Sequence, residues 1–559
     1  MLQSLCRQPA AECPCKPPVA VTKPPAETLL SGSASISSVA TLYEFGMARF
    51  RRSLVIAALM ALVVGSAALM RPARAEFVLP PLTLQAAPPE GGAEFGYAAA
   101  SADVTDDGFA DVVIGAPKAD FAGHTDCGEV TVFLGPSLAS FMRLHAPAPE
   151  DGSYFGWSVT AADFDGDGYA DVAIGSPYVD GLPASGSVTV FFGPSLDASV
   201  TIDNPEPDLN ASFGFSLAAA DVNGDGRADL LVGAPDATVD GKDRAGKGFV
   251  FLGPSFSTSY ALQAPQPEAQ TSFGRALAGA DIDRDGYANV IVGAPDPGVD
   301  FQDLHSGLTF VFSSPSFDTV ITVVDPEPEP EPGAGFGQAV AGGDFNADGY
   351  DDLLIGAFAS PIYPHHTAGK AFAFQGPDLS EIAVLHEPVP ELDAYFGYEL
   401  TVFDVNHDGY DDAVIGVHDA DADNLKATSG GEAYIFSAPS FEDVQHFQDP
   451  QPERFAYFSR SIAAADVDGD GKGDLIAGAP GSDVSGATDA GQAFVFFNER
   501  DPTPAPVGGI AEPPEQVDAL PGGSAGQANG LRDCLTAVAV AAGALALATL
   551  AWRLRRRSS

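Results

Sequence analysis

A Phe-Gly pair that recurs at regular spacing is the feature that most restricts what this chain can fold into. A fixed period is the signature of a repeat architecture, in which one structural unit is used many times. The 559 residues therefore indicate one large repeat domain with flanking segments, not several unrelated domains. The pairs begin at Phe95, Phe155, Phe213, Phe273, Phe336 and Phe396, and Phe458-Ser459 makes a seventh, at intervals of about 60 residues.

Each unit contains the runs expected of four short strands. In the first unit an apolar run follows the Phe-Gly pair, and the runs Asp111–Pro117, Val130–Leu134 and Phe141–His145 come after an Asp-rich loop. Short β-branched and aromatic runs bounded by Gly, Pro and Asp are typical of strands. Four strands per unit, repeated radially, form the blade of a propeller. The sequence thus predicts an all-β fold, a seven-bladed β-propeller of four-stranded blades, over residues 76–499.

The ends of the repeat region predict how the ring closes. No fourth strand follows Phe494–Phe497, whereas Leu82–Glu90 matches Tyr260–Glu268, a segment that precedes a later Phe-Gly pair. We therefore expect the N-terminal segment Val78–Ala86 to complete blade seven. Beyond the first hydrophobic stretch the chain has only Cys127 and Cys534, too few for a disulfide framework. Closure by strand pairing needs no disulfide.

An Asp-rich loop follows the first strand of every unit. It carries Asp at the first position, Asp, Asn or Thr at the third, Asp-Gly at the fifth and sixth, and Asp or Asn at the ninth. Calcium prefers six to eight oxygen ligands, and alternating side chains on a tight loop converge on one point. The EF-hand is excluded because its twelfth position is a Glu, whereas that position is apolar here, as in Ile114.

We expect these loops to bind up to seven Ca²⁺, with a backbone carbonyl at the seventh position. The alternative is that single loops are Asp-Gly turns without metal, the weakest being the first, with Thr105, and the fourth, with Asn289. The candidate ligands, loop by loop, are Asp103, Thr105, Asp107, Phe109 and Asp111; Asp163, Asp165, Asp167, Tyr169 and Asp171; Asp221, Asn223, Asp225, Arg227 and Asp229; Asp281, Asp283, Asp285, Tyr287 and Asn289; Asp344, Asn346, Asp348, Tyr350 and Asp352; Asp404, Asn406, Asp408, Tyr410 and Asp412; and Asp466, Asp468, Asp470, Lys472 and Asp474.

Phe-Gly, the acidic loop and a Gly-Ala-Pro segment such as 115–117 together resemble the FG-GAP repeats of integrin α-chain propellers. Similar repeats occur in glycosylphosphatidylinositol-specific phospholipase D. The resemblance covers about residues 77–499 and implies adhesion or recognition, although the partner does not transfer with the fold. The chain differs in having acidic loops on all seven blades, whereas integrins have them on some. It also departs at Gly175-Ser176-Pro177, Gly356-Ala357-Phe358, Gly416-Val417-His418 and Phe458-Ser459.

Charge and motifs narrow the classes of function. Asp and Glu number 76 against 27 Lys and Arg, a net charge of −49, which disfavours nucleic acid because phosphates are bound by Lys and Arg. We find no nucleophile elbow and no H-E-x-x-H zinc motif, so we expect binding and not catalysis. The expected partner is an extracellular protein or glycan ligand. A structural surface or matrix component, or a calcium-dependent polysaccharide-active enzyme, stay open as alternatives.

The face opposite the acidic loops is where a ligand is expected. The connections between strands two and three vary between units, and variable loops on a rigid scaffold usually carry binding. An acid stands five residues before each repeat Phe, and it either shapes the turn or forms a rim that attracts a cationic partner. These acids are Glu90, Glu150, Asp208, Glu268, Glu331, Glu391 and Glu453.

The flanking segments predict a secreted protein at the cell surface. Residues 47–75 resemble a signal peptide, with Arg49, Arg51 and Arg52, an apolar run and Ala73-Arg74-Ala75, so residues 1–46 are either superfluous or a cytoplasmic tail of an uncleaved anchor. Residues 500–533 form a Pro/Gly-rich linker. Residues 534–552 form a membrane span or a sorting tail that a protease removes, and residues 553–559 a basic cytoplasmic tail.

Overall fold

The computed structural model describes residues 77–498, apart from residues 79, 179–184, 207, 209, 297–305, 328–332, 364 and 421–428. The expected signal peptide, linker, C-terminal span and basic tail therefore lie outside the described residues. No helix long and apolar enough to cross a membrane is found in the part of the chain that is described.

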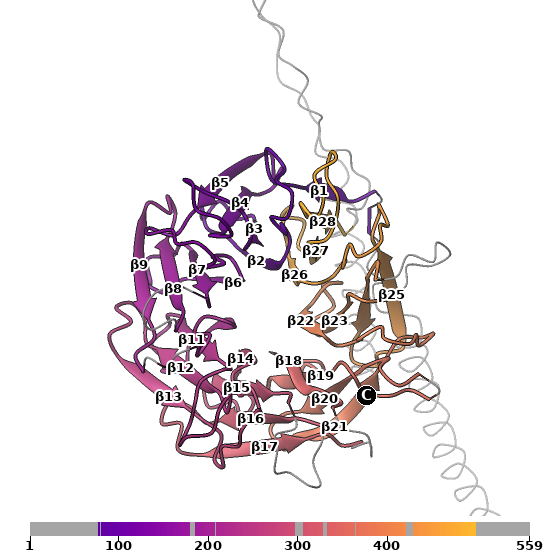
Figure 1. Ribbon diagram of the computed structural model, residues 1–559. Helices are drawn as coiled ribbons and strands as arrows, with labels where there is room; N and C mark the ends of the chain where they lie inside the picture. The colour runs from indigo at the N-terminus through magenta and orange to yellow at the C-terminus, as the bar shows by residue number, and fades with distance from the viewer. Residues whose placement is uncertain are drawn as a thin grey trace, which may run out of the picture. The chain divides into compact units, whose positions relative to one another are not determined.

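The described residues form seven four-stranded antiparallel sheets arranged around a ring (Figure 1). This confirms the predicted seven-bladed β-propeller. Blade one contains β2 (Ala98–Ala102), β3 (Asp111–Ala116), β4 (Glu129–Leu134) and β5 (Ser140–Leu144), and blade two contains β6 (Ser158–Ala162), β7 (Asp171–Ser176), β8 (Ser187–Phe192) and β9 (Ala198–Asp203). Blade three contains β10 (Leu217–Ala220), β11 (Asp229–Ala234), β12 (Lys247–Phe251) and β13 (Ser259–Leu262), and blade four contains β14 (Ala276–Ala280), β15 (Asn289–Ala294), β16 (Leu308–Phe312) and β17 (Val320–Val324). Blade five contains β18 (Phe336–Gly343), β19 (Asp352–Ala357), β20 (Lys370–Gln375) and β21 (Ser380–Leu385), and blade six contains β22 (Glu399–Phe403), β23 (Asp412–Val417), β24 (Glu432–Ser437) and β25 (Asp443–Gln448). Blade seven contains β26 (Ile462–Ala465), β27 (Asp474–Ala479), β28 (Gln492–Phe496) and β1 (Leu82–Leu84).

The N-terminal strand closes the ring, as predicted. β1 pairs antiparallel with β28, with Leu82 opposite Val495 and Leu84 opposite Ala493, and Phe77 forms a further bridge to Asn498. Blade seven is thus completed by the first strand of the propeller. The fourth strand that the end of the repeat region lacks is supplied from its beginning.

Each blade is buried against its neighbours through its second strand. β3, like the second strand of every other blade, is buried at all six positions, because both faces of the sheet are covered by adjacent blades. Strands covered on both faces read as continuous apolar runs, which explains the Val-Val-Ile of β3. Several innermost strands are only partly buried, and the innermost strands of blades one and three, β2 and β10, consist mainly of Ala.

The repeat motif is the contact between blades. Phe95 is fully buried in a cluster that combines Ile114 of blade one with Ile476 and Val495 of blade seven. A Cβ added to Gly115, the Gly of the Gly-Ala-Pro segment, would lie 2.2 Å from the carbonyl oxygen of Gly156 in the next blade. The Phe fills the space between two blades, and the Gly lets their backbones approach.

Candidate metal loops

The acidic loops occupy one position in the fold, between the first and second strands of every blade. The sixth-position glycines have positive φ in all seven loops, for example 88° at Gly108 and 90° at Gly471. Gly adopts a φ this large at lower cost than other residues, which explains why this position is Gly in every loop. The loops therefore bend as the sequence predicts.

The first Asp of each loop holds the loop closed. In the second loop the carboxylate of Asp163 accepts the backbone N–H of Gly166 at 2.6 Å and that of Gly168 at 3.0 Å. In the seventh loop Asp466 accepts N–H groups from Asp470 at 2.9 Å and Gly471 at 2.8 Å. Hydrogen bonds between the first Asp and the backbone of the same loop therefore preorganise the loop.

Three of the seven loops bring carboxylates of three residues within 4.8 Å of one another. These clusters consist of Asp163, Asp165 and Asp171; Asp281, Asp283 and Asp285; and Asp466, Asp468 and Asp474. The second cluster lies in the fourth loop, where Asn289 made the sequence prediction weakest. Its carboxylates come from the first, third and fifth positions, so Asn at the ninth position does not prevent their convergence.

Two other loops hold a buried oxygen with no hydrogen-bond partner at the third position. They are Oγ1 of Thr105 in the first loop and Oδ1 of Asn406 in the sixth, and neither has a partner among the described residues. A buried polar oxygen without a partner costs free energy, which a cation bound in the loop would offset. The donor set of carboxylate, amide and hydroxyl oxygens suits a hard cation such as Ca²⁺.

The ninth position has a second role that the sequence analysis missed. Both carboxylate oxygens of Asp111 are engaged, one by the N–H of Val104 at 2.9 Å and the other by the N–H of Gly135 at 2.8 Å. Gly135 begins the turn between strands three and four, so the carboxylate ties that turn to the acidic loop. The sequence contains a sign of this contact, because the Gly-Pro turn follows Asp111, Asp229 and Asp352 at the same separation of 24 residues.

Burial raises the pKa of these ninth-position carboxyls, although their backbone hydrogen bonds act in the opposite direction. The pKa rises to about 6 for Asp171, Asp229 and Asp352 and to about 7 for Asp412 and Asp474. The nearby aspartates of the same loop raise it further. Desolvation and mutual repulsion thus destabilise the ionised carboxylates, and a bound cation would stabilise them.

The seventh-position side chain packs against a neighbouring acidic loop, a contact that the sequence did not predict. A Cβ at Gly469, the fourth residue of the seventh loop, would lie 2.4 Å from the ring of Phe109 in the first loop. Tyr287 approaches Gly224 in the same way. The seventh-position side chain packs over the loop of the preceding blade, which explains the frequency of aromatic residues there.

The acidic loops are also joined to one another through backbone hydrogen bonds. The N–H of the eighth residue donates to a carbonyl oxygen in the loop of the preceding blade, usually that of the first Asp. These bonds run from Ala110 to Asp466, Ala170 to Asp103, Ala228 to Asp163, Ala288 to Asp221, Asp351 to Asp281, Asp411 to Asp344 and Gly473 to Val405. The seven loops therefore form one continuous hydrogen-bonded ring.

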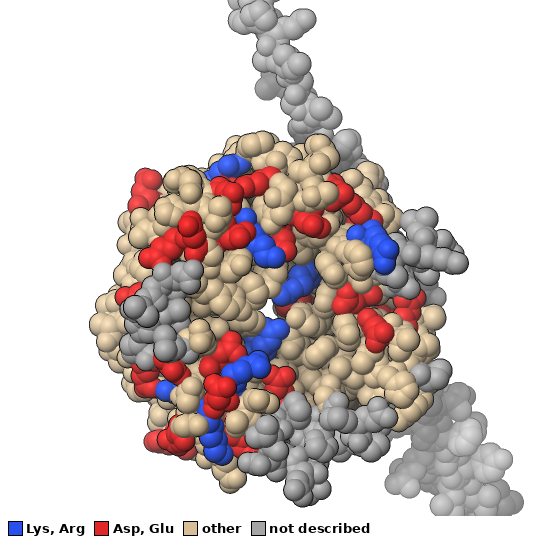
Figure 2. Space-filling view, viewed as in Figure 1, with Lys and Arg blue, Asp and Glu red and all other residues tan. Residues whose placement is uncertain are grey.

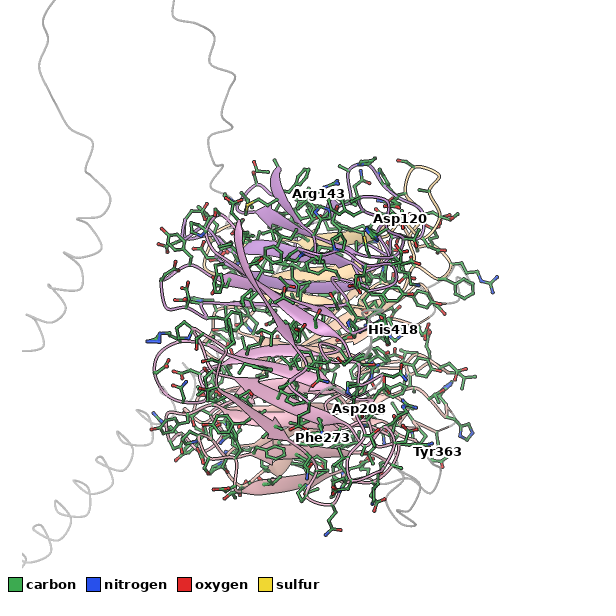
Figure 3. All side chains as sticks on the ribbon, turned by 60° about the vertical axis from the view of Figure 1, so that its left-hand side comes forward. Asp120, Arg143, Asp208, Phe273, Tyr363 and His418 are labelled. Atoms are coloured by element: carbon green, nitrogen blue, oxygen red, sulfur yellow. The ribbon has the colours of Figure 1, made fainter. Side chains whose placement is uncertain are left out.

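The opposite face carries the variable connections. In a view from the side, Asp120, Tyr363 and His418 of three different blades lie toward the same side of the ring (Figure 3). Of the connections expected to vary there, 120–126 and 242–244 are described, and 362–366 is described apart from residue 364. Residues 179–184, 300–305 and 421–426 lie outside the described residues.

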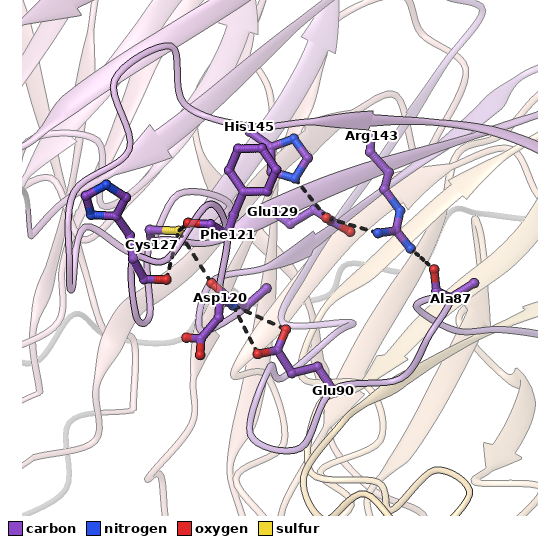
Figure 4. A network of polar contacts seen from close by, with 10 residues as sticks. Ala87, Glu90, Asp120, Phe121, Cys127, Glu129, Arg143 and His145 are labelled. Atoms are coloured by element: carbon purple, nitrogen blue, oxygen red, sulfur yellow. Dashed lines mark hydrogen bonds and ion pairs between the residues drawn. The ribbon is translucent and has the colours of Figure 1, made fainter.

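Three of the acids ahead of a repeat Phe act as braces, whereas Glu150 and Glu268 each have one buried carboxylate oxygen with no hydrogen-bond partner among the described residues. The carboxylate of Glu90 accepts the backbone N–H of Asp120 at 3.2 Å (Figure 4). Asp208 and Glu453 accept the N–H groups of Thr238 and Asp483, again 30 residues later in the chain. Each carboxylate holds the connection between strands two and three of its own blade. These contacts favour the turn-shaping interpretation, and Glu331 lies outside the described residues.

The fold is a propeller with the same acidic loop in every blade. Comparison with known proteins identifies the repeat. The FG-GAP repeat family model matches residues 95–133, 155–191, 213–251, 336–366 and 458–496. These matches fall on blades one, two, three, five and seven. The chain therefore carries FG-GAP repeats and is similar in sequence to integrin α-chains over part of its length.

Curated relatives of two kinds share the repeat. Human phosphatidylinositol-glycan-specific phospholipase D is 31% identical over 226 residues, which cover 36% of this chain and 26% of that protein. Integrin alpha-5 of Xenopus laevis is 32% identical over 224 residues, covering 38% and 21%, and integrin alpha-V of Gallus gallus is 31% identical over 229 residues, covering 38% and 21%. The chain spans about a quarter or less of the length of these relatives.

Proposed function

We propose that this chain is a calcium-binding extracellular propeller that recognises a ligand at the cell surface. One observation carries the proposal. The same acidic loop recurs at the same place in all seven blades, with converging carboxylates or an unpartnered buried oxygen in five of them. Repetition without loss is expected where each copy binds the same ion.

The relatives include integrin α-chains and an enzyme, so the choice between recognition and catalysis depends on the site itself. The match covers 26% of the human phospholipase and 21% of integrin alpha-5 of Xenopus laevis, so it leaves most of each relative unmatched. The three convergent acidic groups within the described residues contain aspartates alone, without the His or Cys that a catalytic zinc site uses. We therefore propose a binding module and not an enzyme. Secretion and a C-terminal membrane anchor are part of the same proposal.

The test is calcium-dependent capture of a ligand by the full chain. An array of extracellular proteins and glycans is probed with the chain in calcium and again with a chelator. We expect specific signals that disappear when calcium is chelated. Signals that survive chelation unchanged, or chemical conversion of an arrayed glycan, would contradict the proposal.

A matched pair of variants separates the metal from other effects. Asp165→Ala removes a carboxylate from the second loop, whereas Asp197→Ala removes an exposed carboxylate from the turn between strands three and four of the same blade. Only Asp165→Ala is expected to reduce the number of calcium ions bound in a calorimetric titration. Equal calcium binding by both variants would show that the loop does not hold the ion.

A further inference from the structure

The end of the central channel away from the acidic loops holds a small cavity to which every blade contributes. Its volume is about 260 Å³. The residue that follows the Phe-Gly or Phe-Ser pair lines it in six blades, and blade six contributes Glu399. These six residues are Tyr97, Trp157, Phe215, Arg275, Gln338 and Arg460. Because this position comes just before the innermost strand and the acidic loop comes just after it, the cavity and the loops lie at opposite ends of the channel.

The charge of the cavity is opposite to that of the chain. Its charged lining residues are Arg275, Arg460 and Glu399, two guanidinium groups and one carboxylate, in a chain whose net charge is −49. Figure 2 shows Lys and Arg side chains gathered around the central opening, with most Asp and Glu further out. The centre of this face therefore attracts an anionic group that its rim repels.

Arg460 is already engaged with neighbouring residues. It pairs with Glu399 at 2.8 Å, donates to the hydroxyl of Tyr97 at 3.0 Å and stacks on the Tyr97 ring at 4.4 Å. Its side chain is 17% exposed. Arg460 thus ties blade seven to blades one and six, and Glu399 also lies within electrostatic reach of Arg275.

Arg275 has hydrogen-bonding capacity to spare. Its guanidinium lies 4.4 Å from the ring centre of Phe215 and donates one bond, at 3.2 Å, to the hydroxyl of Tyr398. No carboxylate among the described residues lies within ion-pairing distance of it. A guanidinium has five N–H donors in a fork that fits a carboxylate, so Arg275 can receive one.

A wall of aromatic rings continues from Arg275. The rings of Trp157 and Phe215 lie 5.4 Å apart, and those of Tyr97 and Trp157 lie 4.7 Å apart. All three side chains are half-buried. Tyr and Trp offer an apolar face together with a polar edge, which matches a sugar ring with its C–H face and its hydroxyl edge. The Asp or Glu side chain of a peptide ligand has no ring, so it would leave most of these aromatic side chains uncovered.

We infer that this cavity binds a carboxylated sugar at the end of a glycan, with Arg275 holding the carboxylate and the aromatic wall covering the ring. A terminal residue is required because the cavity lies at the mouth of a channel and admits one small unit. This inference deepens the proposed function, on which it rests, by naming the ligand class. An acidic peptide is the competing class, and the test includes it.

The experiment follows the fluorescence of Trp157 in the full chain carrying Trp552→Phe, which leaves Trp157 as the only tryptophan. The probes are methyl glucuronide, methyl glucoside, acetate and a short aspartate-containing peptide, all in calcium. We expect saturable quenching by the glucuronide, with the other three probes at least ~10-fold weaker, since loss of a charge-assisted contact or of the stacking wall costs that much.

Variants then test the assigned residue. Arg275→Gln should weaken glucuronide binding ~10-fold or more, at unchanged melting temperature. Arg143→Gln, which removes the same charge from the outer strand β5, should leave binding unchanged. Arg275→Lys keeps the charge without the fork and should fall between the two.

Several outcomes would overturn the inference. Equal affinities for the glucuronide and the glucoside would show that the cavity does not recognise the carboxylate. Equal affinities for the glucuronide and acetate would show that it does not recognise the sugar ring. A tighter complex with the peptide assigns the cavity to a protein partner. A lower melting temperature of Arg275→Gln at unchanged affinity would show that Arg275 only braces the blades.

The array experiment separates failure of this inference from failure of the proposed function. If Arg275→Gln retains calcium-dependent capture of ligands, the cavity assignment is wrong and the proposed function stands. If the parent chain binds glucuronide but shows no calcium-dependent capture, the cavity assignment stands and the proposed function is wrong.

Discussion

The two ends of the central channel are built from the same repeat but differ in how the repeat is used. At the acidic loops every blade presents nearly the same residues in the same geometry, from Asp103 in blade one to Asp466 in blade seven. At the opposite end the corresponding position differs between blades, with Tyr97, Trp157, Arg275 and Gln338 among its occupants. Under the proposed function, the repeated end binds calcium, which each blade does alone, and the varied end binds a ligand, which needs all the blades together.

Calcium removal should produce the largest effect and should act on the loop end of the channel. Each site that is saturated 100-fold adds roughly 2.7 kcal/mol to the free energy of unfolding. Several sites together should therefore raise the melting temperature by many degrees, which calorimetry with and without chelator measures. Because the loops form one hydrogen-bonded ring, we expect the calcium titration to be cooperative. A melting curve that chelator does not change would end the metal assignment.

Deletion of residues 76–86 should affect both ends of the channel, since it removes β1 and opens the ring. Blade seven would then expose the unpaired edge of β28, and open strand edges pair with other chains. We expect aggregation or a swapped oligomer in size-exclusion chromatography. Truncation after Arg500 is the matched control and should leave a stable monomer. A monomeric deletion variant as stable as the parent would show that β1 is dispensable.

The calcium effect should depend on pH in a direction set by the buried carboxyls. Without metal, the pKa of Asp412 and Asp474 is about 7, well above the ordinary value of about 4 in an unfolded chain. The folded state then binds more protons than the unfolded state between these values, so the metal-free protein loses stability as the pH rises through them. Calcium binds the ionised form and opposes this loss.

The calcium-induced rise in melting temperature should therefore be several degrees larger at about pH 8 than at about pH 5. Melting temperatures with calcium and with chelator across this range measure the difference. An increment that shrinks as the pH rises would mean that these carboxyls do not face the cation.

The smallest expected effect concerns the acids on the opposite face. Glu90→Gln, Asp208→Asn and Glu453→Gln each weaken one hydrogen bond to a connection between strands two and three. Each should lower the free energy of unfolding by about 0.5–1.5 kcal/mol, as measured by urea unfolding. If these acids only brace the loops, partner association at low salt should be unchanged in the triple variant. Slower association would instead restore the interpretation of an acidic rim.

The sequence predicts the repeated parts of this molecule well, and the reason is physical. The Phe of each Phe-Gly pair fills the space between blades, and the sixth-position Gly adopts a positive φ, so both features are visible in any single unit. The position of β1 follows from counting strands. The acidic loops follow from local spacing alone, including the fourth, where Asp283 joins the cluster despite Asn289.

The cavity could not be predicted because its residues come together only when the ring closes. Arg275 and Tyr398 are separated by 123 positions, and Arg460 and Tyr97 by 363. No local spacing relates them, and the same position holds an aromatic residue in some blades and an Arg in others. The second role of the ninth-position Asp was missed although its partner lies in the same blade, in the turn that follows strand three, 24 residues later.

Closure by the first strand also has a consequence for how the protein is made. Synthesis delivers β1 at the start of the propeller and its partner β28 at the end, so β1 has no place to pair until blade seven exists. A product that stops before blade seven would leave β1 stranded and its last blade uncovered. Pairing of β1 with β28 thus requires the whole propeller to be synthesised, so only a complete propeller can close its ring.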